Sequence, residues 1–219
     1  MRTEAGGGTA PWRGLYAITP DWNDSRRLLD ATDAILAAGC RTLQYRNKTA
    51  SPCYRQEQAV ALRGLTRRHG ARLIINDDLD LALFCDADGV HLGEDDGALA
   101  AARTRLDQAG PGKLLGASCY QSLDLARTAA RAGADYIAFG SFFPSPTKPQ
   151  ARRADPALLA AARAETGLPV CAIGGITPDN AGELVAAGAD LLAVISALYE
   201  APDPGRAARQ FTTLFEDLP

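Results

Sequence analysis

The sequence predicts an α/β protein that forms a single (β/α)₈ barrel, in which eight parallel strands close into a ring with helices outside it. A unit made of a helix-like segment, a small-residue turn and a short apolar strand recurs along the chain, and eight such strands can be counted. The chain has 219 residues, a length that one barrel domain commonly occupies. An open, doubly wound sheet is the alternative, but the Gly-rich turn that follows its first strand is absent here.

The repeated unit is clearest at small-residue turns, because glycine after a helix is the usual left-handed terminator. These turns are Ala37-Ala38-Gly39-Cys40, Cys85–Asp88, Ala132-Gly133-Ala134-Asp135 and Ala187-Gly188-Ala189-Asp190. Short apolar runs predict strands at Leu15–Thr19, Thr42–Arg46, Arg72–Asn76, Gly89–Leu92, Leu114–Ser118, Tyr136–Gly140, Val170–Ile173 and Leu191–Ile195. Amphipathic segments between them predict helices at Ser25–Ala38, Pro52–Arg68, Ser122–Ala132 and Pro156–Thr166.

Composition narrows the class of protein. Hydrophobic residues make up 47% of the chain and charged residues 22%, which is ordinary for a globular protein with its own core. The formal net charge is −3 and no Lys/Arg-rich run is present, so we expect no nucleic-acid partner. No apolar run reaches the roughly 18 residues of a membrane span, so we expect no membrane partner. Residues 1–13 predict a flexible tail, followed by a catalytic barrel domain at 14–219.

The cysteines predict the cellular compartment. Five of them, Cys40, Cys53, Cys85, Cys119 and Cys171, are scattered singly without metal-ligand spacing. An odd number of cysteines, and no signal-like apolar stretch in the first thirteen residues, indicate reduced thiols and a cytoplasmic protein.

The first candidate site residues follow the second strand, because active sites of this fold form at the C-terminal ends of the strands. This stretch reads Gln44-Tyr45-Arg46-Asn47-Lys48. With a period of two, Gln44, Arg46 and Lys48 share one face, whereas Tyr45 and Asn47 take the other. An amide and two cations suit an anionic ligand that carries a polar ring, and a solvated strand end is the alternative.

Acidic residues follow the third and fourth strands, in Asn76-Asp77-Asp78 and in Glu94-Asp95-Asp96. Carboxylates from two successive strand ends can meet above the barrel and share one Mg²⁺, which prefers oxygen ligands together with phosphate. The alternative is that Asp78 or Asp96 caps the next helix.

The fifth strand ends at Ser118, which can bind a ligand or cap a helix. The sequence positions no histidine to activate it, so we do not expect a serine nucleophile. His91 lies within a predicted strand, where we expect a packed, hydrogen-bonded side chain rather than a base.

Phosphate binding is predicted after the sixth, seventh and eighth strands. Ser145, Thr147 and Lys148 lie in a proline-rich loop that can hold an anion. Gly175 and the pair Ile195-Ser196 follow the last two strands, whose loops form the common phosphate site of these barrels.

Together these segments resemble the thiamine phosphate synthase family, from Gly14–Thr19 to Ile195-Ser196. The resemblance implies two small phosphorylated ring substrates, hydroxymethylpyrimidine diphosphate and thiazole phosphate, and Mg²⁺ as cofactor. It implies pyrimidine diphosphate binding by Gln44, Tyr45, Arg46, Asn47, Lys48, Asn76, Ser118 and Lys148. It implies Mg²⁺ binding by Asp77 and Asp96, and thiazole phosphate binding by Ser145, Thr147, Gly175, Ile195 and Ser196. Catalysis would fall to Arg46, Lys48, Ser118 and Lys148.

Two residues depart from the family's pattern. Ser145 stands where threonine is frequent and keeps the hydroxyl, and Asn47 stands where glutamate is frequent but points away from Gln44. The family is thought to form a carbocation on the pyrimidine methylene. Cations and Mg²⁺ would then neutralise the leaving diphosphate, and the thiazole nitrogen would need no base.

Three other functions stay open. A thiazole tautomerase resembles the synthase but does not join two rings, so it does not need the diphosphate-binding cations. A non-catalytic barrel that binds a phosphorylated regulator would not need paired metal acids. A phosphosugar isomerase would need a carboxylate base beside a neutral histidine, and the sequence offers no clear candidate. The sequence is also compatible with a homo-oligomer.

Overall fold

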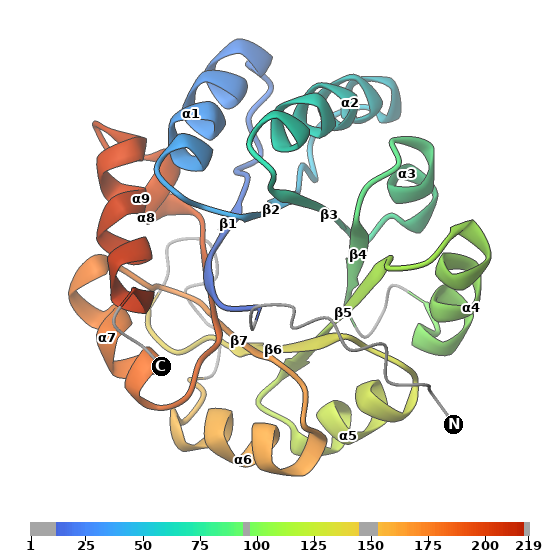
Figure 1. Ribbon diagram of the computed structural model, residues 1–219, viewed down its shortest axis with the longest axis vertical. Coiled ribbons are helices and arrows are strands. Elements are labelled where there is room, and N and C mark those ends of the chain that lie inside the picture. The colour runs from blue at the N-terminus through green and yellow to red at the C-terminus, as the bar shows by residue number, and fades with distance from the viewer. Residues whose placement is uncertain (1–11, 94–96, 145–152, 217–219) are drawn as a thin grey trace.

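The computed structural model describes residues 12–93, 97–144 and 153–216 of the chain. Eight parallel strands pair in chain order, β1 to β8, and β8 pairs with β1 to close the barrel. The helices surround the barrel on the outside (Figure 1). The predicted (β/α)₈ barrel, also called a TIM barrel, is therefore confirmed.

All of the predicted strands form, and four of them have the predicted bounds. β5 runs two residues further than predicted, to Tyr120, because the register shifts between Ser118 and Tyr120 where it pairs with β6. The strands are β1 (Gly14–Ile18), β2 (Thr42–Tyr45), β3 (Arg72–Asn76), β4 (Gly89–Leu92), β5 (Leu114–Tyr120), β6 (Tyr136–Gly140), β7 (Val170–Ile173) and β8 (Leu191–Val194).

The predicted helices form within one residue of their expected bounds. Asp78 accepts a hydrogen bond from the backbone N–H of Leu81, which confirms its role as a helix cap. No helix in the described part of the chain is both long and apolar enough to cross a membrane. The helices are α1 (Ser25–Ala37), α2 (Pro52–Arg68), α3 (Leu79–Phe84), α4 (Leu99–Ala109), α5 (Leu123–Arg131), α6 (Ala157–Thr166), α7 (Pro178–Ala186), α8 (Ser196–Tyr199) and α9 (Pro204–Thr212), followed by a 3₁₀ turn at Thr213–Phe215.

Two apolar clusters hold the barrel together. Alternate residues of each strand point outward and pack against the helices, as Leu73 and Ile75 of β3 do, while Ile74 points inward. The inner cluster lies inside the ring and includes two tyrosines, Tyr16 of β1 and Tyr136 of β6. The barrel interior is therefore a packed core that contains polar groups.

Trp12 lies at the N-terminal ends of the strands. Its ring centroid is 4.7 Å from that of Tyr136, and its Nε1 donates to Thr42 Oγ1 at 3.0 Å. Arg13 forms an ion pair with Asp190 at 3.8 Å. The predicted flexible tail included Trp12 and Arg13, but the indole of Trp12 and the guanidinium of Arg13 have partners at the base of the barrel and pack there. Residues 1–11 lie outside the described part of the chain.

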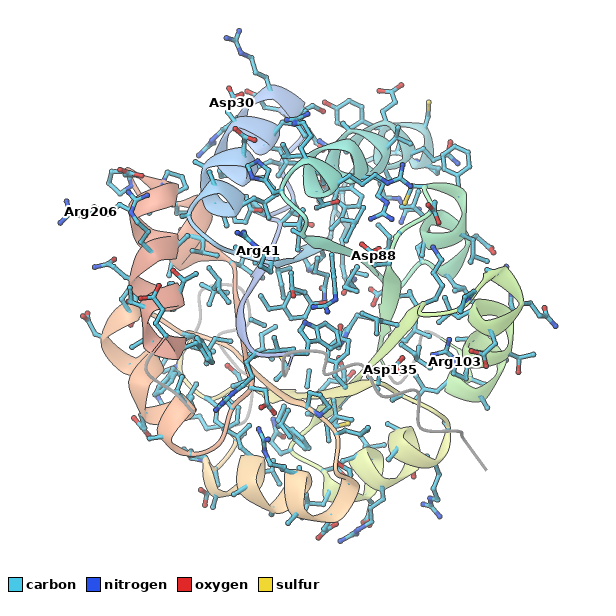
Figure 2. The ribbon with its side chains drawn as sticks, in the orientation of Figure 1. Asp30, Arg41, Asp88, Arg103, Asp135 and Arg206 are labelled. Carbon is cyan, nitrogen blue, oxygen red and sulfur yellow. The ribbon has the colours of Figure 1, made fainter. Side chains whose placement is uncertain are left out.

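A carboxylate clamp is repeated around the same end of the barrel. Three aspartates, each directly before an even-numbered strand, accept a hydrogen bond from a backbone N–H near the start of the preceding strand and pair with a helix arginine. Asp135 and Arg103 are labelled beside each other in Figure 2. Arg103 Nη1 lies 3.0 Å from Asp135 Oδ2 in their ion pair. The three clamps join Asp88 to Leu73 N and Arg63, Asp135 to Leu115 N and Arg103, and Asp190 to Val170 N and Arg163.

Candidate active site

A cavity of about 850 Å³ opens at the C-terminal ends of the strands, where the fold predicts the active site. Parallel strands place their carboxyl ends at one rim, so side chains far apart in sequence meet there. The predicted site residues that line this cavity are Gln44, Arg46, Lys48, Asn76, Asp77, Ser118, Gly175, Ile195 and Ser196.

Tyr45 and Asn47 take the opposite face of β2, as the period of two predicted. Tyr45 donates its hydroxyl to Gln58 Oε1 at 2.9 Å, and Asn47 Nδ2 donates to the same oxygen at 3.2 Å. Both border a smaller hollow beside the main cavity instead of the cavity itself. The structure therefore gives them contacts that shape the turn into α2. Asp96, Ser145, Thr147 and Lys148 lie outside the described residues.

Each described cation at the rim of β2 is paired with a carboxylate. Arg46 Nη1 donates to both carboxylate oxygens of Asp21 at 2.9 Å, and its side chain is 19% exposed. Lys48 Nζ lies 3.1 Å from Asp77 Oδ2, and its side chain is 58% exposed. Arg46 is therefore held in place, whereas Lys48 has room to move towards a ligand.

Asp77 follows β3 in an uncommon backbone conformation. Its φ is 63°, in the left-handed region that aspartate adopts more readily than most side chains. Its backbone N–H donates to the carbonyl of His91 at 2.9 Å. A strained backbone at the rim, with its carboxylate beside Lys48, marks this position as a candidate functional one.

Five side chains from five strands form one hydrogen-bonded chain across the barrel, which we call the interior chain. Its successive contacts, each 2.8 or 2.9 Å long, join Gln44 Nε2 to Tyr16 OH, Tyr16 OH to Tyr136 OH, Tyr136 OH to His91 Nδ1, and His91 Nε2 to Ser118 Oγ. The sequence positions no histidine to activate Ser118, but the folded chain brings His91 into contact with it. Neighbouring strands β4 and β5 bring the two side chains together although they are 27 residues apart.

Burial keeps the ring of His91 neutral. The loss of solvent lowers the pKa of His91 to about 4, and the nearby Asp77 carboxylate opposes this only in part. Burial likewise raises the pKa of Tyr16 and Tyr136, so both stay phenols. His91 contacts a phenol rather than a carboxylate at Nδ1, so the Asp-His-Ser arrangement of a serine nucleophile is not formed. His91 is a packed, hydrogen-bonded residue, as predicted.

Glycines make room for the site at two positions. A Cβ at Gly116 would lie 2.1 Å from Cζ of Tyr136, so only glycine lets the tyrosine ring reach the interior chain. Gly175 has a φ of 64°, and a Cβ there would lie 2.3 Å from the Pro144 carbonyl oxygen. Helix α8 begins at Ser196.

Comparison with known proteins agrees with this geometry. The family model described as thiamine monophosphate synthase matches residues 15–198. The chain belongs to the thiamine monophosphate synthase family. The thiamine-phosphate synthase of Methylobacillus flagellatus is 58% identical over 94% of this chain and 96% of its own length. That of Thiobacillus denitrificans is 56% identical, again over 94% and 96%. The solved thiamine phosphate pyrophosphorylase from Pyrococcus furiosus has a TM-score of 0.82 and 36% identity, covering 94% of this chain and 96% of that one.

Membership of the thiamine monophosphate synthase family confirms the resemblance that the sequence motifs indicated. It makes the chain an enzyme, a transferase of thiamine biosynthesis. A 3-hexulose-6-phosphate synthase structure, at 18% identity and a TM-score of 0.69, shares the fold alone.

Several residues at this thiamine monophosphate synthase site were not predicted from the sequence. Tyr16 lies inside an apolar strand and carries a polar tip towards the cavity, and Asp21 lies in the loop after β1, where it holds Arg46. Two features of the sequence could have indicated these residues. One is an isolated tyrosine on the inward face of a strand, and the other is a single carboxylate after a strand. Tyr120 also lines the cavity, with a φ of 51°, beyond the register shift in β5. Neither the shift nor the strand pairing can be read from local spacing.

Proposed function

We propose that this enzyme joins 4-amino-2-methyl-5-hydroxymethylpyrimidine diphosphate to a thiazole phosphate, which yields thiamine phosphate and pyrophosphate. The observation that carries the proposal is a single cavity with polar groups on two sides. Gln44, Arg46 and Lys48 line it from β2, whereas Gly175 and Ser196 line it from the β7 and β8 side. A volume of about 850 Å³ is large enough for two small ring substrates at once.

The two sides suit the two substrates. The cations after β2 suit the diphosphate, which carries more charge, and Asn76 and Ser118 lie within the same cavity to contact the attached ring. Gly175, Ile195 and Ser196 suit the thiazole phosphate, since loops after the last two strands commonly bind phosphate in this fold. Lys148, Ser145 and Thr147 are assigned to the same substrates by the family resemblance alone.

The reaction needs a leaving group to be stabilised. The bond between the pyrimidine methylene carbon and the diphosphate oxygen breaks, and its electron pair leaves with the diphosphate. Arg46 and Lys48 would neutralise the charge that builds on that oxygen. Because Asp21 already holds Arg46 by two hydrogen bonds, the guanidinium needs little rearrangement during the reaction.

The second half of the reaction forms the carbon–nitrogen bond. The thiazole nitrogen donates its lone pair to the methylene cation, and no proton is transferred in this step. Burial lowers the pKa of His91 to about 4 and raises that of Tyr136, so His91 is a weak proton acceptor and Tyr136 stays a phenol, which fits a site without a general base. Ile18, Ala138 and Ile173 line the inner part of the cavity, and apolar walls would keep water from capturing the cation.

Asp77 suits the proposed Mg²⁺ site. Mg²⁺ is usually held by one or two carboxylates together with substrate phosphates, so no cluster of acids is needed. The described residues contain no group of three His, Cys, Asp or Glu side chains that could hold a metal, but Asp77 presents an oxygen donor at the cavity rim. Asp77, with Asp96 as the family resemblance assigns it, would hold the ion, which when bound supplies further positive charge for the diphosphate.

The test mixes purified enzyme with both substrates and Mg²⁺ and follows pyrophosphate and thiamine phosphate together. Equal formation of both products, abolished by EDTA and restored by added Mg²⁺, is the expected result. Pyrophosphate without thiamine phosphate would mean that water takes the cation and would contradict the proposed ring joining. Neither product, with measurable binding of the thiazole phosphate, would favour a tautomerase or a regulatory barrel.

A further inference from the structure

The hydrogen bonds of the interior chain have a defined direction, because Gln44, its first residue, makes its contact through an amide nitrogen, which can only donate. The amide nitrogen of Gln44 donates to Tyr16 OH, and Tyr16 is only 1% exposed, so among the described residues the acceptor left for the single proton of Tyr16 is its other partner, Tyr136. Tyr136 accepts there and gives its own proton to Nδ1 of His91. Nδ1 therefore accepts, and the one N–H of the neutral ring stands on Nε2, where it donates to Ser118 Oγ.

The opposite direction would leave a buried group unsatisfied. If Nδ1 of His91 carried the proton, Tyr136 OH would accept from both of its partners and its own proton would have no acceptor among them. Tyr136 is completely buried, so water does not satisfy that proton. Buried polar groups left without a partner are rare because they are costly.

The end of the interior chain faces the substrate cavity. Ser118 accepts from His91 and lines the cavity, so its own hydroxyl proton is not used within the chain. We propose that the interior chain makes Ser118 a hydrogen-bond donor to the substrate, and that Tyr16, Tyr136 and His91 are positioning residues that set this polarity. The inference deepens the proposed function and rests on it for the identity of the substrate, whose matching group is a hydrogen-bond acceptor.

The position of the proton on His91 is measured without any substrate. The ring-nitrogen NMR spectrum of protein labelled at histidine shows signals from two rings, His69 and His91. The spectrum of His91→Gln lacks the signals of His91 and so assigns both rings. We expect His91 to carry its proton on Nε2, and we expect Tyr136→Phe to shift the Nδ1 signal because its donor is gone. A proton on Nδ1 in the unsubstituted enzyme, or ring signals that Tyr136→Phe leaves unchanged, would overturn the proposed polarity.

A matched control separates this role from ordinary packing. Tyr199 is also a buried tyrosine, its hydroxyl lies 3.1 Å from Thr32 Oγ1, and it does not line the cavity. Tyr136→Phe should raise the KM for the pyrimidine diphosphate about fivefold to tenfold and leave the KM for the thiazole phosphate unchanged. Tyr199→Phe should leave both KM values unchanged. Equal effects of the two substitutions would reduce Tyr136 to a structural residue and overturn the proposal.

A conservative replacement tests His91 itself. His91→Leu removes the donor to Ser118, whereas the amide of His91→Gln can still donate to it, so glutamine should recover a large part of the affinity that leucine loses. Separate binding of inorganic pyrophosphate and of the aminopyrimidine alcohol to Ser118→Ala identifies which part of the substrate carries the acceptor. No loss for either ligand would overturn the donor role. If the unsubstituted enzyme forms no thiamine phosphate, the proposed function fails, while the NMR result still decides the polarity of the interior chain.

Discussion

At the scale of single residues, the site keeps its cations paired with carboxylates. The two cations differ in exposure and in their contacts, since Arg46 is 19% exposed and bonded to both carboxylate oxygens of Asp21, whereas Lys48 is 58% exposed and lies 3.1 Å from Asp77. Exposed ion pairs contribute little to stability, so the pair of Lys48 can be exchanged for a phosphate at small cost. We therefore propose the assignment of Asp21 to positioning and of Asp77 to ligand binding.

Asp77→Asn tests that assignment. Asparagine tolerates the left-handed backbone at this position, so the substitution removes charge without adding strain. We expect the fold to persist and kcat/KM to fall roughly 10²-fold, with a higher Mg²⁺ concentration needed for half-maximal rate. Asp80→Asn, at an exposed residue that pairs with Arg105, is the control and should retain full activity. A normal rate and normal Mg²⁺ dependence for Asp77→Asn would contradict the assignment.

The buried imidazole of His91 predicts a pH dependence of stability. Its pKa falls from 6.5 to about 4 on folding, so the unfolded chain binds a proton that the folded chain does not. This stability is fully present above about pH 6.5 and is lost as the pH falls towards 4, by up to about 3 kcal/mol. Urea unfolding of the metal-free enzyme at several pH values should show a steeper loss than in His91→Gln. Parallel curves for the two proteins would contradict the prediction.

At the scale of elements, short local devices connect each strand to its neighbours. The clamps of Asp88, Asp135 and Asp190 recur before β4, β6 and β8 (Figure 2 labels the first two). Before β2 the equivalent position is Arg41, whose Nη1 donates to the carbonyls of Leu36 and Cys40 at 3.1 Å. The repeated turns of the sequence thus reflect a contact that is repeated in three units and replaced by different hydrogen bonds in the unit of Arg41.

Asp135→Ala measures the value of one clamp. The substitution leaves the backbone N–H of Leu115 and the guanidinium of Arg103 without this carboxylate, and we expect a loss of about 1–3 kcal/mol in the free energy of unfolding. Asp107 pairs with the same arginine from the exposed side of α4, so Asp107→Ala should cost less than about 0.5 kcal/mol. Similar losses in denaturant unfolding for the two variants would show that the clamp is no more than a surface ion pair.

At the scale of the whole molecule, the two ends of the barrel have different tasks. The cavity opens at the C-terminal ends of the strands, whereas Trp12 and the aspartate clamps stabilise the opposite end. This division is general for the fold, in which loops at one end can vary while the other end maintains stability. Changes at the base should therefore alter stability and leave substrate binding intact.

Trp12→Ala tests the division of tasks. Loss of the indole removes the packing on Tyr136 and the hydrogen bond to Thr42, and we expect the free energy of unfolding to fall by about 3 kcal/mol. Trp12→Phe keeps a ring and should cost less. Both KM values should stay within about twofold of the unsubstituted enzyme, because the hydroxyl of Tyr136 keeps its hydrogen-bond partners Tyr16 and His91. A large rise in either KM would show that Trp12 acts on the site through Tyr136.

The sequence was sufficient for the architecture and for much of the cavity rim. Strand, helix and turn patterns are local, so the strands Arg72–Asn76 and Val170–Ile173 and the helix Pro52–Arg68 could be predicted with their bounds. The alternation along β2 correctly separated Gln44 from Asn47. The packing of Trp12 was missed because its partners on β2 and β6 come much later in the chain.

By itself, the sequence determined the order of the elements and which side chains stand at the strand ends, since both follow from the short-range periods of strands and helices. The tertiary structure alone decided the contacts among those side chains. Tyr16 meets Tyr136 across 120 residues, His91 meets Ser118, and Asp21 holds Arg46, all through the closure and register of the barrel. Pairing of strands is non-local, because the hydrogen bonds that set it join segments whose separation along the chain carries no sign of their contact.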